Sequence, residues 1–289
     1  MNYKMKSLII INFLIVILWG CKNGTITEPP KKELNTNAIQ TEKKYKDPGV
    51  VKNGLIAYWP LDNDAFDYSG NLYGGQINGN MFFKKGINGN CIEFDGIKDF
   101  INFSKEQSPF PISTYTIIFW INTPGMDTLK IRYASRDILE LRYDTKNIYS
   151  PSNIWLYNEY NPNASQFEPY GVYEAFRYSI GDIIVGEGIR HNNWTMFMMG
   201  LSYDIDSIRP YCITSFNEGG SYSIHNHTDA ITDSLIGKIY GGAEFFIGGS
   251  ISDGMLKYRF KGMIDEVRVY NRILTRNEVY TIYHYYAGY

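Results

Sequence analysis

Apolar and polar positions alternate with a period of two along much of the chain after residue 54, which is the pattern of β-strands with one buried face. Residues 138–144 and 267–270 show this alternation most cleanly. The stretch 115–122 is instead apolar almost throughout, which is typical of a strand buried on both faces. Strands are expected at 54–61, 91–96, 99–103, 115–122, 138–144, 192–203, 244–249 and 261–270. The pattern therefore predicts an all-β domain.

One short helix is expected at the C-terminal end. Thr275 and Glu278 have the spacing of a capping box, in which each side chain accepts a hydrogen bond from the other residue's backbone N–H. We therefore expect the helix to begin directly after Thr275.

The first twenty residues have the pattern of an export signal. Lys4 and Lys6 precede an apolar run at 8–18, and about eleven residues are fewer than the roughly 20 that a membrane-spanning helix needs. Cys21 stands where such a signal would be cleaved. The sequence Leu18-Trp-Gly-Cys21 resembles a bacterial lipobox, which implies lipidation of Cys21 and a membrane anchor. An ordinary secretory signal with an incidental cysteine is the alternative.

Residues 21–53 are predicted to be a flexible tether. They contain Pro29-Pro30, many Lys, Asn and Thr, and few apolar residues. About 30 such residues have an end-to-end distance of roughly 30 Å. The predicted organisation is a lipoprotein signal peptide at 1–20, a tether at 21–53 and one β-domain at 54–289.

Charge excludes one class of partner. The chain has a formal net charge of −2, and its acidic excess lies within residues 54–289. That region contains no basic patch interleaved with aromatic residues, so nucleic-acid binding is not expected. Cys91 and Cys212 either form a disulfide, which an exported protein permits, or are two small buried side chains.

Several segments resemble one known family. The run Gly-Met-Ile-Asp-Glu-Val-Arg-Val-Tyr-Asn-Arg-Ile-Leu at 262–274 is similar to the closing segment of laminin-G-like, concanavalin A-type domains. Asp-Tyr-Ser-Gly-Asn at 67–71, Phe-Asp-Gly at 94–96 and the apolar strand at 115–122 resemble earlier parts of the same domains. The resemblance covers about residues 54–280. It implies a two-sheet antiparallel jelly-roll sandwich with a short C-terminal helix, a fold that hosts lectins, adhesion modules and glucanases.

The carboxylate pattern argues against catalysis. Related glucanases carry Glu-x-Asp-x-x-Glu on one strand, because alternation directs all three side chains into the cleft. The nearest match, Glu93-Phe-Asp95, has Lys98 in place of the second Glu, and Glu140-Leu-Arg-Tyr-Asp144 also fails. We expect a non-catalytic module.

Calcium is the metal that the resemblance implies. Such jelly rolls often hold one structural calcium ion near the terminal strands, and Asp67 and Asp265 match the positions concerned. The alternative is that Asp67 caps a turn and Asp265 pairs with an arginine. The pair His225 and His227 is interpreted as part of a polar loop rather than as a zinc site.

The segment 147–190 is the part least like the family, and it is rich in Tyr, Asn and Pro. Binding specificity tends to reside in segments that depart from a shared scaffold. The candidate ligand-binding residues are Trp155, Tyr157, Tyr160 and Tyr170. The predicted function is binding of a glycan or another extracellular ligand by a lipid-anchored protein of the cell envelope, on the surface or periplasmic face of an outer membrane. A structural or adhesive module that binds a protein is the first alternative, and an atypical glycoside hydrolase is the second.

Overall fold

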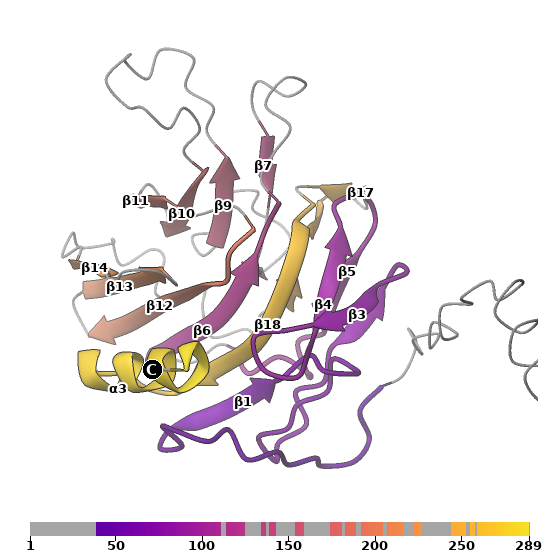
Figure 1. Cartoon of the computed structure of the whole chain (residues 1–289), viewed down its shortest axis with the longest axis horizontal. Coiled ribbons are helices and arrows are strands. Elements are labelled where there is room, and N and C mark those ends of the chain that lie inside the picture. The colour runs from indigo at the N-terminus through magenta and orange to yellow at the C-terminus, as the bar shows by residue number, and fades with distance from the viewer. Residues whose placement is uncertain are drawn as a thin grey trace, which may run out of the picture. The chain divides into compact units, whose positions relative to one another are not determined.

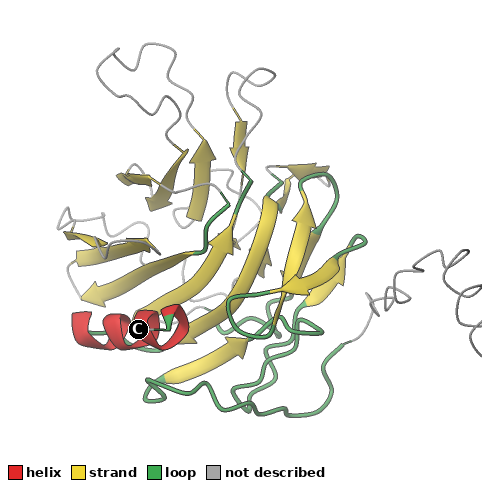
Figure 2. Ribbon diagram, viewed as in Figure 1, coloured by secondary structure: helices red, strands yellow, loops and turns green. Residues whose placement is uncertain are grey.

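The structure is a two-layer antiparallel β-sandwich with one helix at its C-terminal end (Figures 1 and 2). The predicted fold class is therefore confirmed. The computed structural model describes residues 39–110, 114–124, 134–136, 139–142, 154–158, 174–180, 183–188, 192–204, 207–216, 222–226, 244–252, 255–257 and 259–288.

One layer is an eight-stranded antiparallel sheet. It consists of β1 (Leu55–Trp59), β3 (Phe82–Lys85), β4 (Asn90–Asp95), β6 (Thr114–Asn122), β12 (Thr195–Asp204), β13 (Ser207–Phe216), β14 (Tyr222–Asn226) and β18 (Lys261–Tyr270). Its order is β14-β13-β12-β6-β18-β4-β3, and β1 pairs with β18 beside this path. The strands β6 and β18, which the sequence predicts most clearly, lie side by side at its centre.

Most of the other strands form two four-stranded sheets, the first of which faces the eight-stranded sheet across the core. The first has the order β2-β5-β15-β8 and the second β11-β10-β9-β7. The strand β8 also lies against β9, so the two sheets adjoin. Their strands are β2 (Gln76–Asn78), β5 (Phe100–Phe103), β7 (Ala134–Arg136), β8 (Leu139–Arg142), β9 (Ile154–Asn158), β10 (Glu174–Ile180), β11 (Ile183–Gly188) and β15 (Glu244–Ile247), and a separate hairpin joins β16 (Ser250–Ser252) to β17 (Met255–Lys257).

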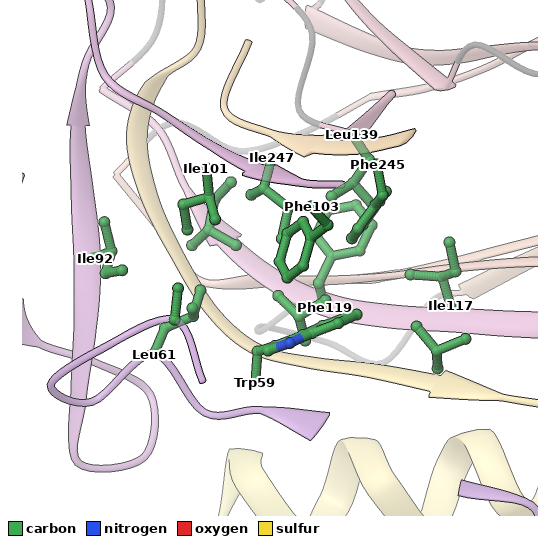
Figure 3. Close-up of a cluster of buried hydrophobic side chains, with 14 of the residues drawn as sticks. Trp59, Leu61, Ile92, Ile101, Phe103, Ile117, Phe119, Leu139, Phe245 and Ile247 are labelled. Carbon is green, nitrogen blue, oxygen red and sulfur yellow. The ribbon is translucent and has the colours of Figure 1, made fainter. Parts of the chain in front are cut away.

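A hydrophobic core lies between the eight-stranded sheet and the sheet β2-β5-β15-β8 (Figure 3). Trp59 and Phe119 come from the first sheet, and Phe103 and Phe245 come from the second. The ring centroids of Trp59 and Phe103 are 4.7 Å apart, and those of Phe103 and Phe245 are 5.0 Å apart. Such contacts between rings add to the stabilisation that buried apolar area provides.

The helix α3 (Arg276–Ala287) covers the opposite face of the eight-stranded sheet. Ile118 and Trp120 alternate along β6 with the core residues and pack against this helix, where Trp120 stacks on Tyr283 with centroids 5.6 Å apart. The apolar run at 115–122 is thus buried on both faces, as expected. The alternation at 267–270 was interpreted as a half-buried strand, and this is wrong, because Arg268 and Tyr270 are fully buried beneath α3.

The start of α3 has the predicted cap. Thr275 and Glu278 form both hydrogen bonds of the capping box, and Gly288 ends the helix in the left-handed conformation. Arg272 pairs with Glu278 at 2.6 Å, which fixes the turn between β18 and the helix. No helix in the described ranges is long and apolar enough to span a bilayer.

The segment 39–53 is packed on the sandwich, so the folded unit begins earlier than residue 54. The amide of Gln40 donates to the carbonyl oxygen of Asp67 at 2.9 Å and accepts from its N–H at 2.7 Å. Lys44 and Lys46 form ion pairs with Asp64 and Asp62. The predicted tether therefore needs correction at its C-terminal end, because residues 39–53, here called the N-terminal arm, exchange specific polar contacts with the domain.

Candidate functional site

The strand β9 brings together two of the four aromatic residues predicted to bind a ligand. Trp155 pairs with Arg177 of β10, and Tyr157 pairs with Ala175 of β10 and with Ser135 of β7. Alternate residues of a strand share one face and lie about 6.7 Å apart. Trp155 and Tyr157 therefore occupy neighbouring positions on one face of this sheet.

The other two aromatic candidates, Tyr160 and Tyr170, lie outside the residues that the structure describes, as do Cys21 and the whole predicted signal peptide. The structure does describe both residues that were predicted to bind calcium. Asp67 and Asp265 are both fully buried, but they have different surroundings.

A β-bulge in β18 sets the surroundings of Asp265. Asp265 pairs with Trp120, whereas Arg268 pairs with Ile118, so β18 contains one extra residue at this point. Glu266 takes a φ of 53°, a left-handed conformation that is uncommon for residues other than glycine. The bulge allows two consecutive acidic residues to be buried within one strand.

Hydrogen-bond donors surround the carboxylate of Glu266. The hydroxyl of Tyr58 donates to it at 2.8 Å and the amide of Asn88 at 2.9 Å. The hydroxyl of Tyr286 also donates to it, and the guanidinium of Arg268 lies 3.5 Å away. A buried carboxylate is tolerated when its oxygens are hydrogen-bonded and a cation is close. Glu266 is therefore a structural centre that joins β1, β18 and α3.

Asp265 has a less complete set of partners. One carboxylate oxygen, Oδ2, accepts from the backbone N–H groups of Ile87 at 2.8 Å and Asn88 at 3.3 Å. The other oxygen, Oδ1, has no hydrogen-bond partner within the described part of the chain. Burial, followed by the negative charges of Glu266 and Asp62, raises the pKa of Asp265 to about 8.

Asp67 holds the turn after β1 in place. Its Oδ1 accepts from the N–H groups of Ser69 at 2.8 Å and Tyr58 at 3.0 Å. Its Oδ2 accepts from the hydroxyl of Ser69 at 3.0 Å and the N–H of Tyr73 at 3.4 Å. Burial raises the pKa of Asp67, although these hydrogen bonds act in the opposite direction. The side chain thus caps its own turn and ties that turn to β1.

The hydrogen-bond donors around Asp67 and Asp265 determine whether either carboxylate has an oxygen left to bind calcium. A carboxylate offers about four lone-pair positions, and at Asp67 all four receive an N–H or O–H donor. Calcium binds six to eight oxygens through such lone pairs, so Asp67 does not fit the ion. Asp265 retains one oxygen without a partner, yet no group of three or more metal-binding side chains gathers in the residues described. Calcium at Asp265 stays a prediction.

The carboxylates nearest to a glucanase motif have other partners. Glu93 pairs with Lys84 at 2.8 Å on the neighbouring strand. The Oδ1 of Asp95 accepts from the backbone N–H groups of the turn after β4, at 2.7 Å from Ile97 and 2.9 Å from Lys98. Partial burial would raise the pKa of Asp95, but these backbone groups outweigh it and lower the pKa below its usual value. Asp95 therefore has the geometry of a turn cap.

The two cysteines of the domain are not bonded to each other. Cys91 is a buried free thiol on β4, and burial raises its pKa to about 12. Cys212 lies on β13, four strand positions away across the sheet. Strands are about 4.8 Å apart, so roughly 19 Å separate the two backbones, far beyond the Cα separation of a disulfide. His225 pairs with Cys212 from β14, and His227 lies outside the described residues.

Sequence reasoning missed two arginines. Arg268 is fully buried and donates to the carbonyl oxygens of Pro48 and Val50. The alternation around Arg268 predicted that its face of the strand is exposed, and so gave no indication that this side chain is buried. Arg177 was missed because the strand pairing that sets it opposite Trp155 links residues 22 positions apart.

Comparison with known proteins finds the same fold in solved structures. No protein-family model and no curated protein sequence matches the chain. A mutant of Trypanosoma rangeli sialidase displaying trans-sialidase activity is similar in structure, with a TM-score of 0.50 and 12% identity over 82% of this chain and 34% of that one. The botulinum neurotoxin serotype C1 binding domain has a TM-score of 0.50 and 10% identity over 81% of this chain and 53% of that one. The chain thus spans about a third to a half of these structures, and the likeness shows a shared fold alone.

Proposed function

We propose that the chain is a lipid-anchored protein of the cell envelope whose β-sandwich binds carbohydrate without cleaving it. The observation that carries this proposal is the placement of Trp155 and Tyr157 on one face of β9. Aromatic residues offer flat apolar faces with polar edges, which suit the faces of sugar rings. Two of them at adjacent positions of one strand face form a surface that is long enough to contact more than one sugar.

The absence of catalysis is part of the proposal. Its support is that the acidic residues nearest to a glucanase motif, Glu93 and Asp95, are engaged in an ion pair and in a turn. Asp265 and Glu266 are fully buried, so a substrate would not reach them without a local rearrangement. A retaining glycosidase needs two accessible carboxylates about 5–5.5 Å apart.

Membership of the laminin-G-like family is proposed on the sequence of β18 and its flanks. The strand, the turn at 271–275 and the helix cap follow one another as they do in the closing segment that the sequence resembles. The solved structures with the same fold include a sialidase and a toxin binding domain, so the fold is compatible with enzymes and with binding modules.

The anchor is proposed from Cys21 and the pattern before it. The test is expression of the full chain in a bacterial host with a labelled fatty acid. The wild-type chain should incorporate the label and sediment with membranes, and Cys21→Ser should do neither. Equal behaviour of the two chains would contradict the anchor and leave the binding function unaffected.

Carbohydrate binding is tested by screening the folded domain, residues 39–289, against an array of neutral and acidic glycans. The proposal expects saturable binding to at least one class of glycan. A stable, folded domain that binds no glycan, but captures one defined extracellular protein, would favour the adhesive alternative instead.

A further inference from the structure

The sheet β11-β10-β9-β7 is shown in Figure 1. Its two faces carry different kinds of residue, and strand register assigns each position to a face. One face carries the bulky apolar residues Ile154, Leu156, Phe176, Tyr178, Ile180, Ile183 and Val185, together with Asn158, Glu174, Glu187 and Ala134 at one end of the sheet and Arg136 on β7. The other, here called the Trp155 face, carries Ser135, Trp155, Tyr157, Ala175, Arg177, Ser179, Ile184, Gly186 and Gly188. In a β-sandwich the more apolar face of a sheet is the one that another layer covers. On this argument we take the Trp155 face as the one that a ligand would approach.

An arginine stands at the centre of the Trp155 face. Arg177 is directly opposite Trp155 on one side and Gly186 on the other. Residues directly opposite each other in antiparallel strands are about 5 Å apart, so Trp155 and Arg177 are nearest neighbours on this face. A guanidinium binds a carboxylate through two parallel hydrogen bonds, which is more specific than contact with a neutral hydroxyl.

Small residues occupy the positions beside these groups. Tyr157 is opposite Ala175, and Ala175 is opposite Gly188 on the next strand. Glycine within a strand often marks a place where a ligand approaches the backbone closely. The Trp155 face therefore combines two aromatic residues, one cation and a strip of positions without bulky side chains.

We propose that the Trp155 face binds an acidic glycan, with Trp155 and Tyr157 contacting sugar rings and Arg177 binding a sugar carboxylate. This rests on the proposed function that the sandwich binds carbohydrate, and it adds the location of the site and the chemical class of the ligand. The domain as a whole has more acidic than basic residues, so affinity for an acidic glycan would come from this arginine rather than from a basic surface.

The test is isothermal titration of the domain with two matched pairs of glycans. One pair is an oligogalacturonide and its fully methyl-esterified form, and the other is sialyllactose and lactose. The wild-type domain should bind at least one acidic member about tenfold or more tightly than its neutral counterpart. Trp155→Ala should weaken binding of both members by about tenfold.

Arg177→Gln separates the contribution of the arginine charge from that of the aromatic rings, because it removes the charge and keeps Trp155 and Tyr157. It should bind the acidic glycan about 10–100-fold more weakly while its affinity for the neutral member changes little. Phe82→Ala, which removes a half-exposed aromatic ring from β3 in the eight-stranded sheet, is the matched control and should bind like the wild type. Thermal unfolding of each variant confirms that it is folded.

The outcomes separate the site from the function. Binding that survives both Trp155→Ala and Arg177→Gln would place the site elsewhere and leave the proposed function intact. Equal affinity for acidic and neutral members would overturn the ligand class. A domain that binds no member of either pair, or of the wider array, would overturn the proposed function together with this inference.

Discussion

The guanidinium of Arg268 joins β18 to the N-terminal arm, because its Nη2 donates a 2.7 Å hydrogen bond to the carbonyl oxygen of Pro48. Its Nη1 donates to the carbonyl oxygen of Val50 at 3.1 Å. The same group lies 5.1 Å from the ring centroids of Tyr58 and Tyr286. One buried cation thus connects the arm, the central sheet and α3, and the charge of Glu266 beside it offsets part of the cost of its burial.

Replacing Arg268 by Met should destabilise the domain strongly. The substitution keeps most of the side-chain volume but removes the buried cation beside Glu266, which keeps only Lys46 at 3.9 Å, and takes one donor from the carbonyl groups of Pro48 and Val50. Breaking such a buried pair typically costs about 3–5 kcal/mol of unfolding free energy. Chemical denaturation measures the cost.

Arg272→Met is the matched control for that measurement. Arg272 forms an ion pair with Glu278, but both side chains remain about a quarter exposed. Exposed pairs contribute about 1 kcal/mol or less. A loss at Arg272 as large as the loss at Arg268 would contradict the role assigned to the buried guanidinium.

Removing the N-terminal arm should lower stability in the same way. A chain that begins at residue 54 loses two backbone acceptors of Arg268, the carbonyl groups of Pro48 and Val50, and the ion pairs of Lys44 and Lys46. We expect its free energy of unfolding to fall by at least about 3 kcal/mol, which lowers the melting temperature by roughly 10 °C. A chain that begins at residue 39 is the control. Equal melting temperatures would show that the arm is a tether after all.

Asp67→Asn tests whether the Asp67 carboxylate holds its turn and whether it binds calcium. The new amide group faces N–H and O–H donors and cannot accept from them, so we expect a loss of about 2–3 kcal/mol. We expect the same loss in calcium and in a chelator, because N–H and O–H donors already occupy the lone pairs of Asp67. A loss that appears only in calcium would identify Asp67 as a ligand.

Asp265 should make stability depend on pH. Its pKa is about 8 in the folded protein against 3.8 for the free side chain, so between these values the folded state holds a proton that the unfolded state has released. Its contribution to stability is therefore present in acid and falls as the pH rises, by about 1.4 kcal/mol per pH unit. Denaturation from pH 5 to pH 7 in a chelator, for the wild type and for Asp265→Asn, measures the difference. Parallel curves would show that Asp265 is ionised throughout.

The sequence predicted the parts of the fold that depend on local pattern. The doubly buried strand at 115–122 and the cap at Thr275 are local features, and the structure confirms both of them. The bulge at Glu266 has no local signal, because a left-handed glutamate is held by partners distant in sequence, Tyr58 and Asn88. Local alternation also cannot show that a helix covers the second face of β18.

The candidate site was predictable only in part, for a similar reason. The aromatic residues of 147–190 stood out by composition, and the shared face of Trp155 and Tyr157 follows from their spacing alone. Arg177 lies beside Trp155 only because β9 pairs with β10, and the apolar–polar pattern of a sequence does not predict which strands pair. The roles of Asp67 and Asp265 likewise depended on which donors the fold brings to each carboxylate.

The most direct test of the central claim is to measure glycan binding and glycan integrity in one sample. The domain is titrated with the best ligand from the array, and the mixture is then incubated for a long period and analysed by mass spectrometry. The account predicts saturable binding that Trp155→Ala weakens, together with an oligosaccharide of unchanged mass. Shortened products that form with the wild-type chain and not in its absence would contradict it, as would a folded domain that binds no glycan.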